Sequence, residues 1–149
     1  MELKYEHLVG QEFDWGTKDC LGLFRAFYQD NFGITITDYA RPTNWDADKL
    51  NLIEMLYERE GFEKITHWKP KDLRPADVLA TAIGSSNPNH FVIYVGDNKI
   101  LHHFAHRRST LDTYRPYWPV CFVLRHPDVP DLRPVHKDVT IKELLDARY

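Results

Sequence analysis

The stretch TKDCLGLFRAFY (residues 17–28) decides the fold that the sequence predicts, because it combines a helix start with an apolar face. Its apolar side chains recur at helical spacing, so one side of the helix is expected to face a core. Asp19 is a good N-cap residue, and Gly33 is a typical helix stop. The sequence therefore predicts a helix over residues 19–31, with Cys20 in its first turn.

The composition indicates one folded domain. The chain has 149 residues, of which 43% are hydrophobic, 13% aromatic and 28% charged. These values are typical of a globular protein. The formal net charge of -3 gives no basic surface for nucleic acid or an anionic membrane, so neither partner is expected.

The cysteine count and the N-terminal segment indicate in which cellular compartment the protein folds. Two cysteines, Cys20 and Cys121, provide no disulfide framework, so folding in a reducing cytoplasm is plausible, and Cys121 within VCFVL is expected in the core. The first residues lack the apolar core of a signal peptide, and no run is long and apolar enough to span a membrane. A protein of this kind that acts outside the cell would need another means of delivery.

The order of the remaining elements indicates an α+β fold. A second helix is expected within residues 46–62 (DADKLNLIEMLYEREGF), ending at Gly61. Helices followed by an antiparallel sheet are the α+β arrangement. Four strands are expected after Pro75, at residues 77–83, 90–96, 99–104 and 120–126.

The sequence after residue 126 predicts a C-terminal tail that is separate from the domain. The stretch HPDVPDLRP (residues 126–134) has three prolines and is expected to be an extended linker. Thr140 and Glu143 have capping-box spacing, which predicts a short helix. We therefore expect one domain over residues 1–126, followed by a linker and a short helix over residues 127–149.

Cys20 has two possible roles. A thiol at a helix N-terminus faces unpaired N–H groups and the positive end of the helix dipole, which favour the thiolate that a nucleophile needs. Free cysteine is also among the most buried residue types and packs as a small apolar group. The position of Cys20 alone does not decide between these roles.

Three histidines provide candidate bases. His90 begins an apolar strand, where a polar side chain needs a partner or a function. His102 and His103 follow on the next strand and face opposite sides of the sheet. A three-residue turn at residues 96–98 would pair Val92 with His102 and bring His102 beside His90. A two- or four-residue turn would present His103 instead. The spacing leaves both registers open.

Taken together, DWGTKDCLGLFRAFY and NHFVIYVGDNKILHHF resemble the NlpC-type cysteine peptidases, papain-like enzymes that cleave peptidoglycan stem peptides. The family pattern is Asp-Cys-x-Gly at a helix start, then His-x-x-Ile-Tyr-x-Gly in a strand, then a polar residue twelve positions after that histidine. LHHFAHRRS and YRPYW resemble the branch found in the tails of lambda-like phages. The positions that match are Asp19, Cys20, Gly22, His90, Ile93, Tyr94, Gly96 and His102.

The resemblance implies a fold and a reaction. The fold would be a papain-like NlpC fold, with N-terminal helices packed on a central antiparallel sheet and the nucleophile at a helix N-terminus. Cys20 would attack a stem-peptide carbonyl, His90 would act as base and then acid, and His102 would orient His90. Asp14, Trp15 and His103 align near these residues and are candidates for substrate binding.

Three positions depart from the family pattern. Phe13 stands where a tyrosine that could help to bind an oxyanion is usual, so the backbone N–H of Cys20 would carry more of that stabilisation. Leu21 replaces a serine, and Ala76-Asp77 replaces a Gly-Asp pair. None of these changes removes the proposed catalytic residues.

The favoured function is a tail-tip peptidoglycan endopeptidase that opens the cell wall during genome delivery. Such a protein would need no cofactor, would assemble in the host cytoplasm with other tail-tip proteins, and would act from the virion on the cell wall. The rival is a tail-tip assembly protein that keeps the fold with little catalysis. An acyltransferase on the same scaffold is less favoured. Zinc bound by Cys20, His102, His103 and His106 is also less favoured, because adjacent strand residues point apart.

Overall fold

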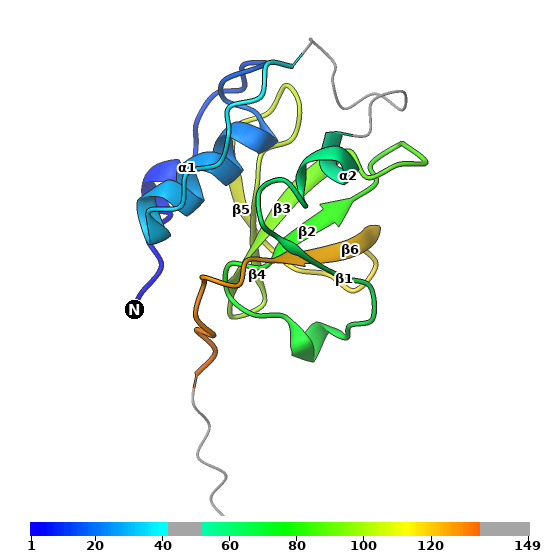
Figure 1. Cartoon of the computed structure of the whole chain (residues 1–149). Helices are drawn as coiled ribbons and strands as arrows, with labels where there is room; N and C mark the ends of the chain where they lie inside the picture. The colour runs from blue at the N-terminus through cyan, green and yellow to red at the C-terminus, as the bar shows by residue number, and fades with distance from the viewer. Residues whose placement is uncertain (42–51, 135–149) are drawn as a thin grey trace, which may run out of the picture.

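The fold is a six-stranded antiparallel sheet with helices on one face, as a computed structural model shows for residues 1–41 and 52–134 (Figure 1). The strand order is β1-β6-β2-β3-β4-β5. The strands are β1 (Glu63–Ile65), β2 (Val78–Thr81), β3 (His90–Gly96), β4 (Lys99–His102), β5 (Thr110–Thr113) and β6 (Val120–Arg125). The helices are α1 (Cys20–Phe32), α2 (Leu52–Leu56) and the short 3-10 helices η1 (Glu6–Leu8) and η2 (Pro70–Asp72).

Helix α1 forms as the sequence predicts. The Asp19 side chain caps its N-terminus by accepting a hydrogen bond from the Gly22 N–H at 2.9 Å. Gly33 ends the helix in the left-handed conformation, with φ at 63°, and its N–H donates to the Gln29 carbonyl at 3.0 Å. The predicted helix is therefore confirmed to within one residue at its end.

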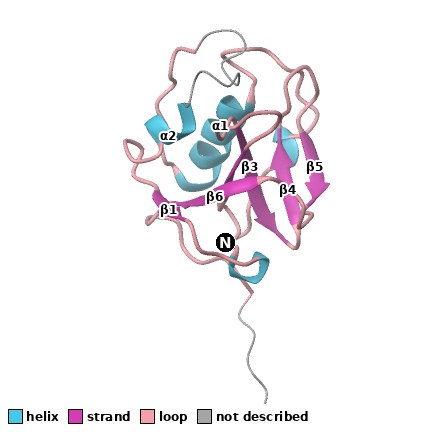
Figure 2. Cartoon of the chain, turned by 90° about the vertical axis from the view of Figure 1, so that its right-hand side faces the viewer, coloured by secondary structure: helices cyan, strands magenta, loops and turns pink. Residues whose placement is uncertain are grey.

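Helix α1 lies along β3 and runs in the same direction. Phe24 stacks on Phe91, with 5.0 Å between ring centroids. One turn later, the Tyr28 hydroxyl donates to the Ala76 carbonyl, and the Ala76 N–H donates to Tyr94 further along β3. One turn before Phe24, the start of α1 must therefore lie toward the start of β3. Figure 2 shows α1 beside the sheet, with β3, β4 and β5 as neighbouring arrows.

Each face of the sheet has its own hydrophobic cluster, because side chains alternate along the strands. The larger cluster joins α1 and α2 to one face, and Ile53 and Phe24 within it are fully buried. The smaller cluster covers the other face and includes Val92 and Ile100, with Trp118 packed against it. The sheet is thus covered on both sides, and helices contribute to one side only among the described residues.

The β3–β4 hairpin combines a two-residue turn with a bulge. Asp97 and Asn98 both have positive φ, as a type I′ turn requires, and Gly96 pairs with Lys99. A bulge between Tyr94 and Gly96 then shifts the ladder by one residue. Val92 consequently pairs with His102, which is the register that the sequence associated with a three-residue turn.

Cys121 is exposed, so its predicted place in the core was wrong. Its neighbours explain the error: Val120 pairs with Thr81 and Phe122 with Ala80, so Cys121 is the extra residue of a bulge in β6. The bulge leaves Phe122 facing the helices, where it is buried, and turns the thiol of Cys121 toward solvent.

The other predicted elements are confirmed where the structure describes them, except for the end of the second helix. The four predicted strands correspond to β2, β3, β4 and β6, each within a few residues of its expected bounds. The second helix is described from Leu52, because residues 42–51 lie outside the described part of the chain. It ends at Leu56 and not at the predicted Gly61, because residues 57–61 form turns, in which the Gly61 N–H donates to the Glu58 carbonyl three residues back. The predicted helix at Thr140 and Glu143 also lies outside it. Strands β1 and β5, at the two edges of the sheet, were not predicted.

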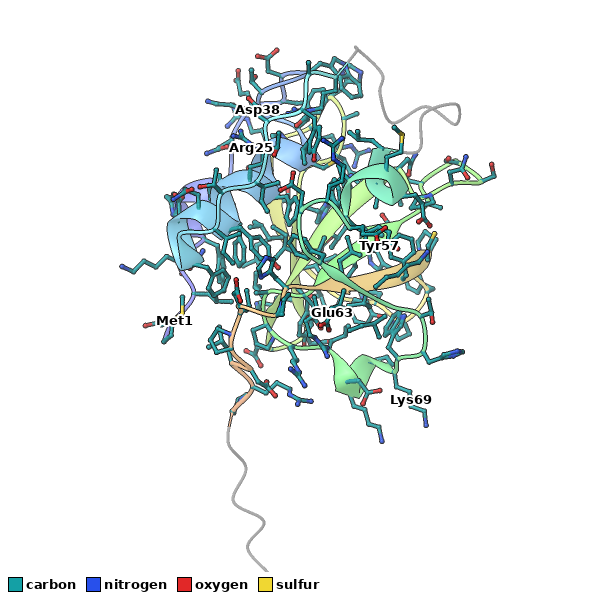
Figure 3. All side chains as sticks on the ribbon, viewed as in Figure 1. Met1, Arg25, Asp38, Tyr57, Glu63 and Lys69 are labelled. Atoms are coloured by element: carbon teal, nitrogen blue, oxygen red, sulfur yellow. The ribbon has the colours of Figure 1, made fainter. Side chains whose placement is uncertain are left out.

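The segment after β6 is irregular but lies against the domain. Val129 packs on the larger hydrophobic cluster, and Asp131 lies 3.5 Å from the guanidinium of Arg74. On the other side of the molecule, Arg25 and Asp38 form a similar exposed ion pair at 3.5 Å (Figure 3). No helix among the described residues is long and apolar enough to cross a membrane.

Candidate functional site

Three chain segments meet at one end of the sheet. Cys20 is the first residue of α1, His90 the first of β3 and His102 the last of β4. The packing of α1 along β3 places the helix start toward the His90 end of that strand. Burial lowers the pKa of His103 and the negative charge of Asp19 opposes this effect, so the start of α1 also lies near the residue that follows β4. The predicted catalytic residues therefore come from elements that converge.

The start of α1 is held by a buried ion pair. Arg41 donates to both carboxylate oxygens of Asp19, at 2.7 and 2.8 Å, and both side chains are 1% exposed. The same carboxylate accepts from the Gly16 and Gly22 N–H groups. Cys20 follows directly and is 5% exposed, within the larger hydrophobic cluster. The thiol is thus placed at a rigid helix N-terminus.

His90 and His102 lie together. Their ring centroids are 6.1 Å apart, and the two rings are nearly perpendicular. Phe104 stacks on His90 at 4.6 Å and meets the edge of His102 at 4.5 Å. Trp118 stacks on Phe104 at 5.8 Å and closes the group on its other side. The aromatic side chains cover most of the surface of both imidazoles, and His90 is 6% and His102 4% exposed.

The buried imidazoles are held in the neutral state. Burial lowers the pKa of His90 from 6.5 to about 3, with smaller contributions from His102 and His103. Burial also lowers the pKa of His102, although the Asp112 carboxylate opposes this effect. The Nε2 atom of His102 lies 3.9 Å from an Asp112 oxygen, which is too long for a hydrogen bond. A neutral imidazole can accept a proton, as a general base must.

Several ring nitrogens have no hydrogen-bond partner in the described part of the chain. They are Nε2 of His90, both nitrogens of His102 and Nε2 of His103. Buried polar atoms are nearly always paired in folded proteins, because leaving one unpaired is costly. A cluster of three such side chains therefore indicates a site that serves a function.

A cavity of about 370 Å³ opens beside His90. It is lined by Ile83, Asn89, His90, Phe104, Ala105 and Arg107. A second cavity of about 330 Å³ is also lined by residues of the loop that follows β4. Its lining residues are Glu12, Phe13, His106, Arg107 and Arg108. Both cavities are large enough to hold one or two residues of a peptide.

The candidate substrate-binding residues occupy different positions. His103 is 1% exposed and lies against Phe13, with 5.5 Å between ring centroids. Trp15 is half-buried and contacts Phe13 at 4.7 Å. Asp14 is exposed and accepts a hydrogen bond from the Thr17 hydroxyl at 2.6 Å. Trp15 and Asp14 flank the start of α1, whereas His103 is enclosed, so His103 is the least accessible of the three.

Sequence reasoning did not identify several residues at this site. Arg41 lies 22 residues after Asp19, and nothing in its local sequence marks it as the partner of a helix cap. Phe104 and Trp118 lie in the LHHFAHRRS and YRPYW stretches that resemble the phage-tail branch, but neither was assigned a role at the site. Arg107 lines a cavity wall, a position that depends on the conformation of the loop after β4. Within the described residues, no group of three or more histidine, cysteine or acidic side chains is arranged to hold a metal ion.

Comparison with known proteins agrees with this arrangement. The NlpC/P60 family matches residues 10–125, which include α1, the whole sheet and the converging ends. The chain is 36% identical over 112 residues to the "Tail tip assembly protein K" of Escherichia phage lambda, an alignment that covers 75% of this chain and 54% of that relative. The chain thus spans about half the length of this relative. The match to most of the domain and the identity to this relative show that the chain belongs to the NlpC/P60 family.

Proposed function

We propose that the chain is a cysteine peptidase that cleaves peptidoglycan stem peptides. The main support is a cysteine at the start of a helix that packs along the strand beginning with His90, together with the buried, neutral pair His90 and His102, in a region that matches the NlpC/P60 family. Members of this family commonly cut the bond between D-glutamate and a diamino acid, and we propose this bond as the substrate.

The proposed reaction has two steps. The Cys20 thiol loses its proton to His90 as the sulfur attacks the substrate carbonyl carbon. His90 then gives this proton to the leaving amine, and a thioester to Cys20 remains. In the second step, water attacks the thioester with His90 again as base, which releases the carboxylic acid and restores the thiol. His90 is neutral in the resting protein, so its ring has a nitrogen that can accept this proton.

His102 and the backbone have supporting roles in this proposal. His102 would orient His90, whose ring centroid lies 6.1 Å from its own. Phe13 offers no hydroxyl to the developing oxyanion, so the N–H of Cys20 at the helix start would supply that stabilisation. Asp14, Trp15 and His103 remain candidates for substrate contacts.

The biological setting follows from the lambda relative. That relative is named as a tail tip assembly protein, so we propose that this chain is also part of a phage tail tip. It would assemble in the host cytoplasm beside other tail-tip proteins and be carried in the virion. There it would open the peptidoglycan locally when the genome is delivered.

Digestion of purified peptidoglycan tests the proposal. The native protein should release new peptide ends, and Cys20→Ala should reduce the rate by about a thousandfold or more, because it removes the nucleophile. Cys121→Ala is the matched control, since Cys121 is exposed and lies outside the site. Mass spectrometry of the products would identify the bond cut. Cleavage that survives Cys20→Ala, or that Cys121→Ala abolishes, would contradict the mechanism.

A role in tail assembly without catalysis is the second candidate. Two observations favour it: Cys20 is 5% exposed among apolar side chains, and the lambda relative is named for assembly. Phage tails made with the Cys20→Ala chain distinguish the two functions. Normal tails that deliver DNA at the native rate would favour assembly, whereas normal tails with delayed delivery would favour the peptidase.

A further inference from the structure

Arg107 lines the cavity beside His90 and carries a charge with no partner among the described residues. The side chain is exposed, and its guanidinium makes no hydrogen bond or ion pair with any residue in ranges 1–41 and 52–134. The adjacent Arg108 differs, since it lies 3.5 Å from the Glu12 carboxylate. Arg107 thus presents an unneutralised guanidinium, whose five donors suit a carboxylate.

The position of Arg107 relates it to the candidate site. Its side chain lines the cavity that contains His90 and also lines the second cavity, so it stands in the wall between them. The lining of the His90 cavity contains no acidic residue. Burial is the main cause of the lowered pKa of His102, and the positive charge of Arg107 also lowers it. An anionic group in this cavity would therefore meet one cation in the same wall as His90.

The loop that carries Arg107 is held in a fixed conformation. His106 adopts a positive φ of 63°, which is unusual for a residue other than glycine, and the Arg107 N–H donates to the Phe104 carbonyl at 3.2 Å. Beyond Arg107, buried Ser109 joins the loop to Gln11 through backbone and side-chain hydrogen bonds of 3.0 and 2.9 Å. A guanidinium on an anchored loop loses less entropy on binding than one on a free loop.

The proposed substrate supplies a suitable carboxylate. Glutamate has two carboxyl groups, and only one of them forms the amide bond to the diamino acid. The other carboxyl group stays ionised, a few bonds from the carbonyl that Cys20 would attack. We infer that Arg107 binds this free carboxylate and makes the site select peptides with a carboxylate over those with a carboxamide at that position. This inference rests on the proposed function for its choice of ligand.

Binding of two synthetic peptides to the Cys20→Ala protein tests the inference without any cleavage. The peptides contain alanine, D-glutamate linked through its side-chain carboxyl, and a diamino acid, and they differ in whether the free carboxyl is a carboxylate or a carboxamide. Calorimetry should show about tenfold tighter binding of the carboxylate peptide. Adding Arg107→Gln should remove this preference, while Arg107→Lys should keep part of it.

Arg108→Gln is the matched control, because it removes the same charge from the neighbouring residue, which already has an acidic partner. The preference should survive this change. Equal loss from both substitutions would mean that general charge, and not Arg107, attracts the peptide, and would overturn the inference. An unchanged preference in Arg107→Gln, or no binding of either peptide at millimolar concentration, would also overturn it.

Cleavage and binding measurements together distinguish failure of the peptidase proposal from failure of the role proposed for Arg107. If the native protein cleaves the peptides but Arg107→Gln retains the preference for carboxylate in kcat/KM, the peptidase stands and the role of Arg107 does not. If the native protein cleaves neither peptide but binds the carboxylate form through Arg107, the binding site stands and the peptidase does not.

Discussion

The Asp19 carboxylate links the helix cap to a buried arginine. It accepts hydrogen bonds from the Gly16 and Gly22 N–H groups and from both sides of the Arg41 guanidinium. With 1% exposure on each side chain, neither charge is solvated by water. Arg41 thus allows a carboxylate to cap the helix directly beside Cys20 without leaving a buried negative charge uncompensated.

Arg41→Gln should destabilise the protein by about 3 to 5 kcal/mol, because it leaves the Asp19 carboxylate buried without its cation. Urea denaturation followed by fluorescence would measure the change. Arg25→Gln is the control, since Arg25 shares the partner Asp38 but its ion pair is partly exposed, and it should cost no more than about 1 kcal/mol. Equal effects of the two substitutions would contradict the role assigned to Arg41.

His90 makes stability depend on pH. Its pKa of about 3 in the folded protein is below the ordinary value of 6.5, so the unfolded state binds more protons between these values. The free energy of unfolding should therefore fall as the pH falls, by about 2 kcal/mol from pH 6.5 to pH 5 from this residue. His102 and His103 act in the same direction, because burial also lowers the pKa of each.

Urea titrations at pH 6.5 and pH 5 test this dependence. His90→Gln should reduce the loss of stability between the two pH values, because glutamine does not titrate. His67→Gln is the control, since His67 is exposed and lies away from the site, and it should leave the loss unchanged. A pH dependence identical in His90→Gln and the native protein would show that His90 is not buried in the neutral form.

At the level of elements, the contact between α1 and the preceding loop sets the position of Cys20. A Cβ atom added at Gly22 would lie 2.0 Å from the backbone carbonyl oxygen of Thr17. That oxygen belongs to the backbone, so the loop or the helix would have to move to relieve the clash. This clash explains why the Asp-Cys-x-Gly pattern has glycine at position 22, where a side chain would not fit.

Gly22→Ala should cost about 1 to 3 kcal/mol of stability despite the higher helix propensity of alanine, because the clash involves backbone on both sides. It should also lower peptidase activity, since it shifts the helix start against His90. Gln29→Ala, on the exposed side of the same helix, should stay within about 0.5 kcal/mol and keep activity. Thermal melts and peptidoglycan digestion measure both effects, and a stabilised Gly22→Ala would refute the steric argument.

At the level of the whole molecule, the segment after β6 tests the proposed domain boundary at residue 126. Val129 packs on the larger cluster and Asp131 pairs with Arg74, so these contacts are lost in a chain that ends at residue 126. Such a chain should be less stable than one ending at residue 134 by about 1 to 2 kcal/mol. Paired thermal melts would show the difference, and equal melting temperatures would instead place the boundary at residue 126.

The sequence determined the elements whose signals are local. Helix α1 followed from its apolar spacing, its Asp19 cap and its Gly33 stop, because each of these acts within a turn or two of backbone. The central strands followed from runs of apolar residues that are buried on both faces. The edge strands β1 and β5 escaped prediction, since they are short, largely polar and exposed, and exist through pairing with β6 and β4.

The hairpin spacing left open which histidine lies beside His90, and the family resemblance favoured His102. The tertiary structure shows how His102 reaches that place and what surrounds it. The turn has two residues, which alone would have presented His103, and a bulge before Gly96 restores the pairing of Val92 with His102. The Arg41 partner of Asp19 and the loop that holds Arg107 likewise come from distant parts of the chain. A bulge or an ion pair of this kind forms because packing elsewhere favours it, so no local pattern of residues could have fixed it.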